Sequence, residues 1–278
     1  MQHWLAPPRR GAFCTTALTP FVALSLLISL FSSLSAHAQN LQRALPLDQL
    51  RSGIEFAGAD VRAMQADEFA NPGFLWVDRG ERLWREPAGG KSCSACHGDA
   101  RVSMRGVAAR YPAHDATSRQ VLDLEARIND CRVRRQELPA LARESDDLLG
   151  LTAYVAQQSR GVPIAVRVDA AAGPTYERGR TFYFARHGQM NLSCAQCHDS
   201  NWGKKLYVET LSQGHGNAFP AYKLEWQSLG SLQRRIRACM YGIRAQMPDY
   251  GAPELTDVEL YLAWRAQGLP VEAPGVRR

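Results

Sequence analysis

The motif C-x-x-C-H occurs twice in this chain, at residues 93–97 and again at residues 194–198. Two thiols two residues apart can form thioethers to the two vinyl groups of a porphyrin, and the adjoining histidine can ligate the iron from one face. A lone copy could also be half of a zinc site or a redox dithiol, although haem attachment is favoured, and two copies weaken both alternatives further. The sequence predicts two covalently attached haem c groups, with the residues Cys93, Cys96, His97, Cys194, Cys197 and His198.

The first 38 residues have the three parts of a secretory signal peptide. Arg9 and Arg10 precede an apolar run of 14 residues, Phe21–Leu34, and Ala36–Ala38 is a small-x-small cleavage site. An uncleaved membrane anchor is the alternative, but this run is shorter than the roughly 20 apolar residues that a spanning helix needs. We therefore expect cleavage after Ala38 and an exported mature protein.

The composition fits one or two globular domains. Of the 278 residues, 45% are hydrophobic and 22% are charged, which excludes a disordered or collagen-like chain. No later stretch is apolar enough to predict a membrane span after the signal is removed. The net charge of +6 falls to +4 when Arg9 and Arg10 leave with the signal, and this small excess argues against a nucleic-acid partner.

The exported part of the chain carries one pattern twice. In each copy a glycine with an aromatic residue four positions later precedes C-x-x-C-H, and a segment Leu-x-x-Arg-Ile-x-x-Cys follows it. The first copy contains Gly80, Trp84 and the segment Leu124–Cys131; the second contains Gly179, Tyr183 and the segment Leu232–Cys239. The repeat predicts two modules of similar structure.

Each copy closes with a predicted amphipathic helix. Ser145 is a suitable N-cap for the first helix, and Thr256 with Glu259 forms a capping box for the second. Both helices are expected to end at a glycine, Gly161 or Gly268, because proline follows each of them closely.

This order of features resembles the class I cytochrome c domain, in which two helices cross at the small glycine. The resemblance implies an all-α fold with two class I cytochrome c-like domains in tandem, at residues 39–168 and 169–278. Such modules are small, and haem burial would supply much of their apolar interior. The linker is expected near Val166–Pro174, where the pattern breaks.

The second axial ligand of each iron is the open question. Cys131 and Cys239 are the two cysteines left over from the motifs, and they are candidates for thiolate ligands, for a disulfide with each other, or for inert buried thiols. Met104 lies only seven residues beyond the first motif, which is too near to reach the far face. Met247 lies 49 residues beyond His198, a spacing typical of methionine ligands, so it competes with Cys239.

An arginine precedes each surplus cysteine by four residues, Arg127 before Cys131 and Arg235 before Cys239. On a helix these positions share a face, so the guanidinium would stabilise the thiolate and lower the pKa of the thiol. The alternative role is to pair with haem propionates. We favour the propionate role for Arg127 and the functional role for Arg235.

The segments 214–222 and 230–239 and the ending Leu260–Arg265 resemble the SoxA family, whose members are the larger subunits of the periplasmic SoxAX cytochromes of thiosulfate oxidation. The resemblance covers residues 52–278. It implies an L-cysteine S-thiosulfotransferase, which joins thiosulfate oxidatively to a cysteine of the carrier SoxYZ, while electrons leave through haem to an acceptor cytochrome c. It also implies a SoxX partner subunit and a periplasmic location.

The resemblance also implies roles for individual residues. Cys239 matches the catalytic cysteine, which the family carries as a persulfide and which ligates the second haem iron. Arg235 matches the substrate-binding arginine, and Cys131 matches the axial thiolate of the first haem iron. Met247 with Pro248 departs from the family pattern and keeps methionine ligation open.

Two functions compete at this point. One is an enzyme of sulfur chemistry at the second haem, and the other is a passive dihaem electron carrier. The pair Arg235 and Cys239 favours the enzyme, because a carrier needs no substrate cation beside a surplus thiol. The first module could then be structural only, since a thiolate ligand lowers the haem potential.

Overall fold

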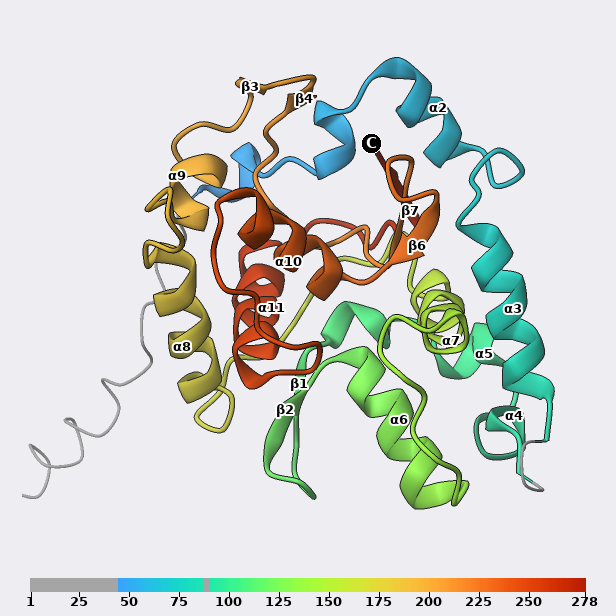
Figure 1. Ribbon diagram of the computed structural model, residues 1–278. Helices are drawn as coiled ribbons and strands as arrows, with labels where there is room; N and C mark the ends of the chain where they lie inside the picture. Colours follow the sequence, from blue (N-terminus) through green and yellow to red (C-terminus); the bar gives the residue numbers. More distant parts are fainter. Residues whose placement is uncertain (1–44, 88–90) are drawn as a thin grey trace, which may run out of the picture. The chain divides into compact units, whose positions relative to one another are not determined.

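Two pairs of crossing helices form the centre of the computed structural model, which describes residues 45–87 and 91–278 (Figure 1). The predicted signal peptide, residues 1–38, lies outside the described residues. In the first pair, α3 (Phe74–Arg85) packs on α7 (Asp146–Gln157), and in the second pair, α8 (Gly173–Phe184) packs on α11 (Pro253–Arg265).

Each pair crosses at the glycine that the repeat singles out. A Cβ atom on Gly80 would lie 2.0 Å from the backbone oxygen of Gly150, and a Cβ atom on Gly179 would lie 1.9 Å from that of Asp257. Only glycine allows the backbones to approach this closely. The expected crossing is therefore confirmed in both copies.

The remaining helices are short, apart from the two that carry the surplus cysteines. Those two are α6 (Leu124–Arg135) and α10 (Leu232–Gly242), and the motif helices are α4 (Cys93–His97) and α9 (Cys194–His198). The others are η2 (Leu47–Gln49), η3 (Gly53–Phe56), α2 (Ala59–Ala66), α5 (Ala100–Ser103) and η4 (Ala108–Arg110).

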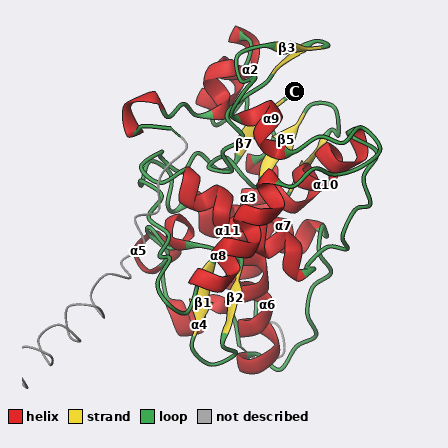
Figure 2. Ribbon diagram, turned by 90° about the vertical axis from the view of Figure 1, so that its left-hand side faces the viewer, coloured by secondary structure: helices red, strands yellow, loops and turns green. Residues whose placement is uncertain are grey.

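Short strands accompany these helices, so the all-α prediction is incomplete (Figure 2). The pairs are β1 (Ala113–Asp115) with β2 (Gln120–Leu122), and β3 (Lys205–Leu206) with β4 (Glu209–Thr210). A three-stranded sheet has the order β6 (Ser228–Gly230), β5 (Ala221–Lys223), β7 (Gly275–Arg277). In this sheet β5 is antiparallel to β6 and parallel to β7.

The helix ends match the sequence predictions only in part. Ser145 caps α7, since its side chain accepts a hydrogen bond from the Leu148 amide. The predicted capping box at Thr256 is wrong, because α11 already begins at Pro253, a residue that favours the first turn of a helix.

Both closing helices also stop before their predicted glycines. They end at Gln157 and Arg265, and Gly161 and Gly268 lie one turn beyond, each with positive φ. The connection between α7 and α8 covers the predicted linker, although α8 already begins at Gly173.

The two copies of the repeat join through reciprocal hydrogen bonds just after these helices. The Gly161 amide donates to the Val271 carbonyl at 2.9 Å, and the Gly268 amide donates to the Ile164 carbonyl at 3.0 Å. The N-terminal segment contributes to the junction, because the side chain of Gln65 in α2 accepts a hydrogen bond from the Val276 amide in β7. Residues 45–278 therefore form one compact unit.

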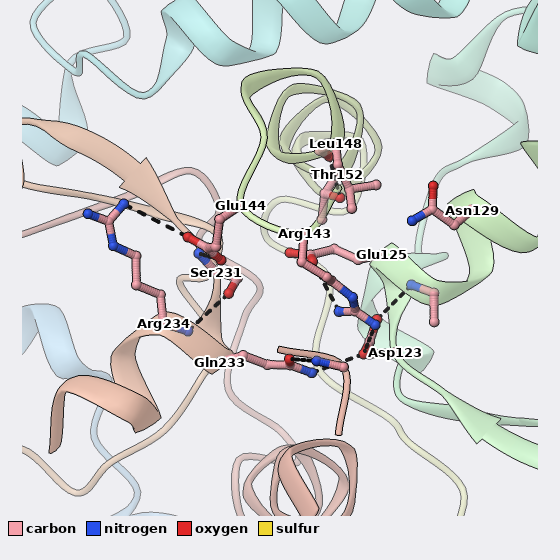
Figure 3. Close-up of polar contacts among 12 residues, drawn as sticks. Asp123, Glu125, Asn129, Arg143, Glu144, Leu148, Thr152, Ser231, Gln233 and Arg234 are labelled. Carbon is pink, nitrogen blue, oxygen red and sulfur yellow. Dashed lines mark hydrogen bonds and ion pairs between the residues drawn. The ribbon is translucent and has the colours of Figure 1, made fainter. Parts of the chain in front are cut away.

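A buried polar cluster also lies where the two copies meet (Figure 3). Arg143 donates to Asp123 at 2.8 Å and to Glu125 at 3.0 Å, and Gln233 donates to Asp123 and to Glu259 at 3.2 Å each. Burial and the neighbouring Asp123 raise the pKa of Glu125 to about 8 and also raise that of Glu259. A cavity of about 120 Å³ adjoins the cluster.

Among the described residues, no helix combines the length and apolar character that crossing a membrane requires. The longest is α11, with 13 residues.

Candidate active site

The second C-x-x-C-H motif forms a short helix, α9, whose first turn is held by its own neighbours. Ser193 caps the helix by accepting from the Gln196 amide, and the Gln196 side chain accepts in return from the Ser193 amide. At the other end Asp199 accepts from the Tyr183 hydroxyl at 2.8 Å and pairs with Arg265. The motif is therefore fixed to α8 and α11, the crossed helix pair.

The orientation of His198 fits a role as an iron ligand. Its Nδ1 lies 2.7 Å from the Ser212 carbonyl oxygen, a contact that fixes the ring and assigns the proton to Nδ1. A Cβ atom on Gly214 would lie 2.8 Å from the ring, so glycine is needed for this close packing. Nε2 is then the nitrogen that can ligate a haem iron.

Helix α10 brings Cys239 to His198. The Cys239 residue is exposed, and its thiol hydrogen-bonds with His198. Desolvation by the surrounding protein raises the pKa of this thiol, but the charge of Arg235 and the contact with His198 outweigh it and lower the pKa to about 7. A thiol with this pKa is about half thiolate at neutral pH.

The two motif cysteines border the same site. Burial, with the neighbouring Cys239 as the next cause, raises the pKa of Cys194 to about 12 and also raises that of Cys197. Cys194, Cys197, His198 and Cys239 therefore gather at one place, as the sequence pattern predicts for a covalently held haem.

Two cations lower the pKa of the Cys239 thiol. Arg235, one turn before it on α10, has a side chain that is 35% exposed, and its Nη2 lies 3.8 Å from an oxygen of Glu209. Lys223 on β5 also lowers the pKa of Cys239, but the sequence analysis did not identify it. No local pattern marks this lysine, since only the pairing of β5 with β6 and β7 brings it to the site.

The first motif forms α4, and its surroundings are built in the same way. Ser92 caps the helix by accepting from the Ala95 amide. The Trp84 ring on α3 lies 5.6 Å from the His97 ring, and the Gln136 side chain contacts the Cys93 sulfur at 3.9 Å. Burial and the neighbouring Cys131 raise the pKa of Cys93, which indicates that Cys131 lies close to this motif.

Cys131 differs from Cys239 in its charge environment. Burial raises the pKa of the Cys131 thiol, and Arg127 offsets this rise only in part. Arg127 itself donates to Asp115 at 2.6 Å, to Asp130 at 3.0 Å and to the Tyr111 hydroxyl at 3.2 Å. Its charge is therefore compensated by carboxylates of the chain.

The alternatives for the surplus cysteines can be compared with these positions. All six described cysteines are free thiols, so a disulfide between Cys131 and Cys239 is not formed, and the two lie beside different motifs. Met247 follows α10 in a loop and is 37% exposed, whereas Cys239 contacts His198 directly.

The comparisons with known proteins agree with this geometry. A family model described as the SoxA/TsdA cytochrome c domain matches residues 79–164. The L-cysteine S-thiosulfotransferase subunit SoxA of Pseudaminobacter salicylatoxidans is 39% identical over 84% of this chain and 82% of its own. That of Rhodovulum sulfidophilum is 38% identical, over 83% of this chain and 81% of its own.

A solved structure shows the same similarity in three dimensions. The crystal structure of SoxXA from P. pantotrophus matches with a TM-score of 0.79 and 34% identity, over 82% of this chain and 87% of the matched one. Sequence and fold therefore point to the same family.

Proposed function

This chain belongs to the SoxA family of L-cysteine S-thiosulfotransferase subunits, and on that premise we propose that it joins thiosulfate to a cysteine of the carrier SoxYZ. One thiosulfate dianion and one carrier thiol give a cysteine S-thiosulfonate, one proton and two electrons. A sulfur–sulfur bond forms, the S–H bond breaks, and the electrons pass to an acceptor cytochrome c.

The observation that carries this proposal is the Cys239 thiol beside the Arg235 guanidinium, one turn earlier on α10. A thiol with a pKa of about 7 supplies a sulfur nucleophile at neutral pH. A guanidinium recruits the thiosulfate dianion through several fixed N–H donors, and it stabilises the charge as sulfur bonds form. A passive electron carrier requires neither group.

We propose two haem c groups, one on each motif. Cys93 and Cys96 would attach the first, and His97 and Cys131 would hold its iron. Cys194 and Cys197 would attach the second, His198 and Cys239 would hold its iron, and Cys239 would carry a persulfide. When bound, haem supplies a one-electron acceptor next to the reacting sulfur.

We further propose that each crossed helix pair is the centre of one class I cytochrome c-like domain, at residues 39–168 and 169–278. The partner subunit would be SoxX, because the matched structure is a SoxXA complex. The predicted signal at residues 1–38 supports a periplasmic location.

The test is the variant Cys239→Ala, assayed as the complex with SoxX by thiosulfate-dependent reduction of an acceptor cytochrome c in the presence of SoxYZ. The rate should fall by about a thousandfold or more. Intact-protein mass should still show two haems in the variant and, in the wild type only, one extra sulfur atom. Full activity without Cys239 would leave the passive electron carrier as the function.

A further inference from the structure

Lys223 is a buried cation that the proposed chemistry does not yet use. Its side chain is only 2% exposed, and its ammonium group lies 3.2 Å from Glu225, 3.8 Å from Glu209 and 5.2 Å from the centre of the Trp226 ring. Burial lowers its pKa, and the nearby charge of Arg235 lowers it further. Burying a lysine near another cation costs folding free energy. A function for the Lys223 side chain would explain why the protein bears this cost.

Glu209 is the carboxylate that Lys223 and Arg235 share. Its two oxygens lie 3.8 Å from Lys223 Nζ and 3.8 Å from Arg235 Nη2, so it stands between the two cations. Both distances exceed those of a direct hydrogen bond, which makes these pairs weaker than the 3.2 Å pair of Lys223 with Glu225. The two cations therefore bind the Glu209 carboxylate only weakly.

The hairpin that carries Glu209 is short and has an exposed turn. Strands β3 and β4 have two residues each, and the turn between them, Tyr207 and Val208, is 95% and 73% exposed (Figure 1). Glu209 itself is 39% exposed in its side chain. Few contacts oppose a movement of this carboxylate away from the two cations.

The charges explain why such a movement matters to a dianion. Arg235 and Lys223 lie 3.8 Å from the two oxygens of Glu209, which cancels one of their two positive charges in the absence of substrate, and both cations lower the pKa of the Cys239 thiol. A bound thiosulfate carries two negative charges and would be repelled by Glu209 at the same position. Substrate and Glu209 therefore exclude one another.

We propose that Arg235 and Lys223 together form the dianion site, and that Glu209 is an internal counter-ion which the substrate displaces. This inference rests on the proposed function for the identity of the dianion. Other charged groups near Lys223 are Glu225 after β5, and Arg277, which faces Lys223 across the β5–β7 pair and is itself held by Glu272.

The test compares Glu209→Gln with Glu225→Gln, because both residues pair with Lys223, whereas of these two only Glu209 is within ion-pair distance of Arg235. The oxidised complex with SoxX is titrated calorimetrically with thiosulfate, and separately with sulfate, which cannot react. Glu209→Gln should lower the dissociation constants of both dianions about fivefold to tenfold at low ionic strength. Glu225 is 68% exposed, so its variant should change binding by at most about twofold.

Steady-state kinetics separates effects of the substitutions on substrate binding from effects on folding. Glu209→Gln should lower KM for thiosulfate without raising kcat, while Lys223→Met should weaken binding about tenfold and Lys223→Arg should restore most of it. Unchanged or weaker dianion binding in Glu209→Gln overturns the inference, even if Lys223→Met fails to fold. Sulfate binding is measured without turnover, so this result stands apart from the Cys239→Ala test of the proposed function.

Discussion

The two surplus cysteines stand in matching positions of a repeated sequence, yet the protein gives their thiols opposite properties. Each follows an arginine by four residues on a helix of similar length, α6 or α10. Burial raises the pKa of Cys131, whereas the pKa of Cys239 is lowered to about 7. The spacing of arginine and cysteine alone therefore does not determine the chemistry of the site.

Part of the difference comes from the counter-ions of the arginines, and part from the neighbouring His198, which only Cys239 has as a cause of its lowered pKa. Arg127 is held by direct hydrogen bonds to Asp115 and Asp130, and Asp130 itself raises the pKa of Cys131 against the effect of Arg127. Arg235 has a long ion pair with Glu209 at 3.8 Å, and its charge acts on the Cys239 thiol and is available to an incoming anion. The arginine thus has a structural role in the first copy and supports the reactivity of the cysteine in the second.

The strongest challenge to this comparison is to remove each arginine in turn. Arg235→Ala should lower kcat/KM for thiosulfate about a hundredfold, because it removes charge-assisted contacts to the dianion. Arg127→Ala should leave kcat/KM within about twofold. It should instead lower the unfolding temperature, since Asp115 and Asp130 each lose one of their two arginine partners and keep only Arg134.

Steady-state kinetics with thermal unfolding of both holo variants separates these outcomes. Equal losses of kcat/KM would mean that the two arginines act alike. In that case the difference in counter-ions would not explain the function.

The structural features that the sequence predicts correctly are those that depend on residues near one another in the chain or on the internal repeat. Glycine at the helix crossings and the N-cap at Ser145 are examples. The early start of α11 at Pro253 was missed because a plausible capping box lay three residues further on. Two local signals competed there, and proline at the first helical position prevailed.

The counter-ions could not be predicted in this way. Arg127 and Asp115 are 12 residues apart and meet because the hairpin β1–β2 folds back on α6. Glu209 reaches Arg235 and Lys223 through a separate hairpin of two-residue strands. Strands this short carry too little periodicity to be recognised in a sequence.

A second prediction addresses what the two copies share. Gly80→Ala and Gly179→Ala should each lower the free energy of unfolding by about 3 kcal/mol, because the added methyl group would meet backbone rather than a flexible side chain. Chemical denaturation of the two holo variants measures both losses. The control is Gly173→Ala on α8, where a Cβ atom has no neighbour within 4 Å.

Similar losses at Gly80 and Gly179, with none at Gly173, would show that the two helix pairs are equivalent supports. A large loss in one copy only would mean that the repeat is not structurally equivalent at its crossings.

The smallest expected effect concerns the junction between the copies, where Glu125 occupies the position that Gln233 occupies in the second copy. Burial raises the pKa of Glu125 to about 8, so the folded state holds a proton that the unfolded state releases at lower pH. The stability that this proton contributes is complete below the ordinary pKa of a glutamate. It is lost as the pH rises through about 8.

Between pH 6 and pH 8 the titration of Glu125 alone should therefore lower the wild-type free energy of unfolding by about 2 kcal/mol. Glu125→Gln makes the first copy resemble the second and should remove this contribution, while Glu259 still titrates in the same cluster. Denaturant unfolding at the two pH values measures the difference, with the exposed Glu254→Gln on α11 as control. If Glu125→Gln keeps the full pH dependence, the asymmetry between Glu125 and Gln233 has no energetic consequence, and the contrast between the copies is confined to their cysteines.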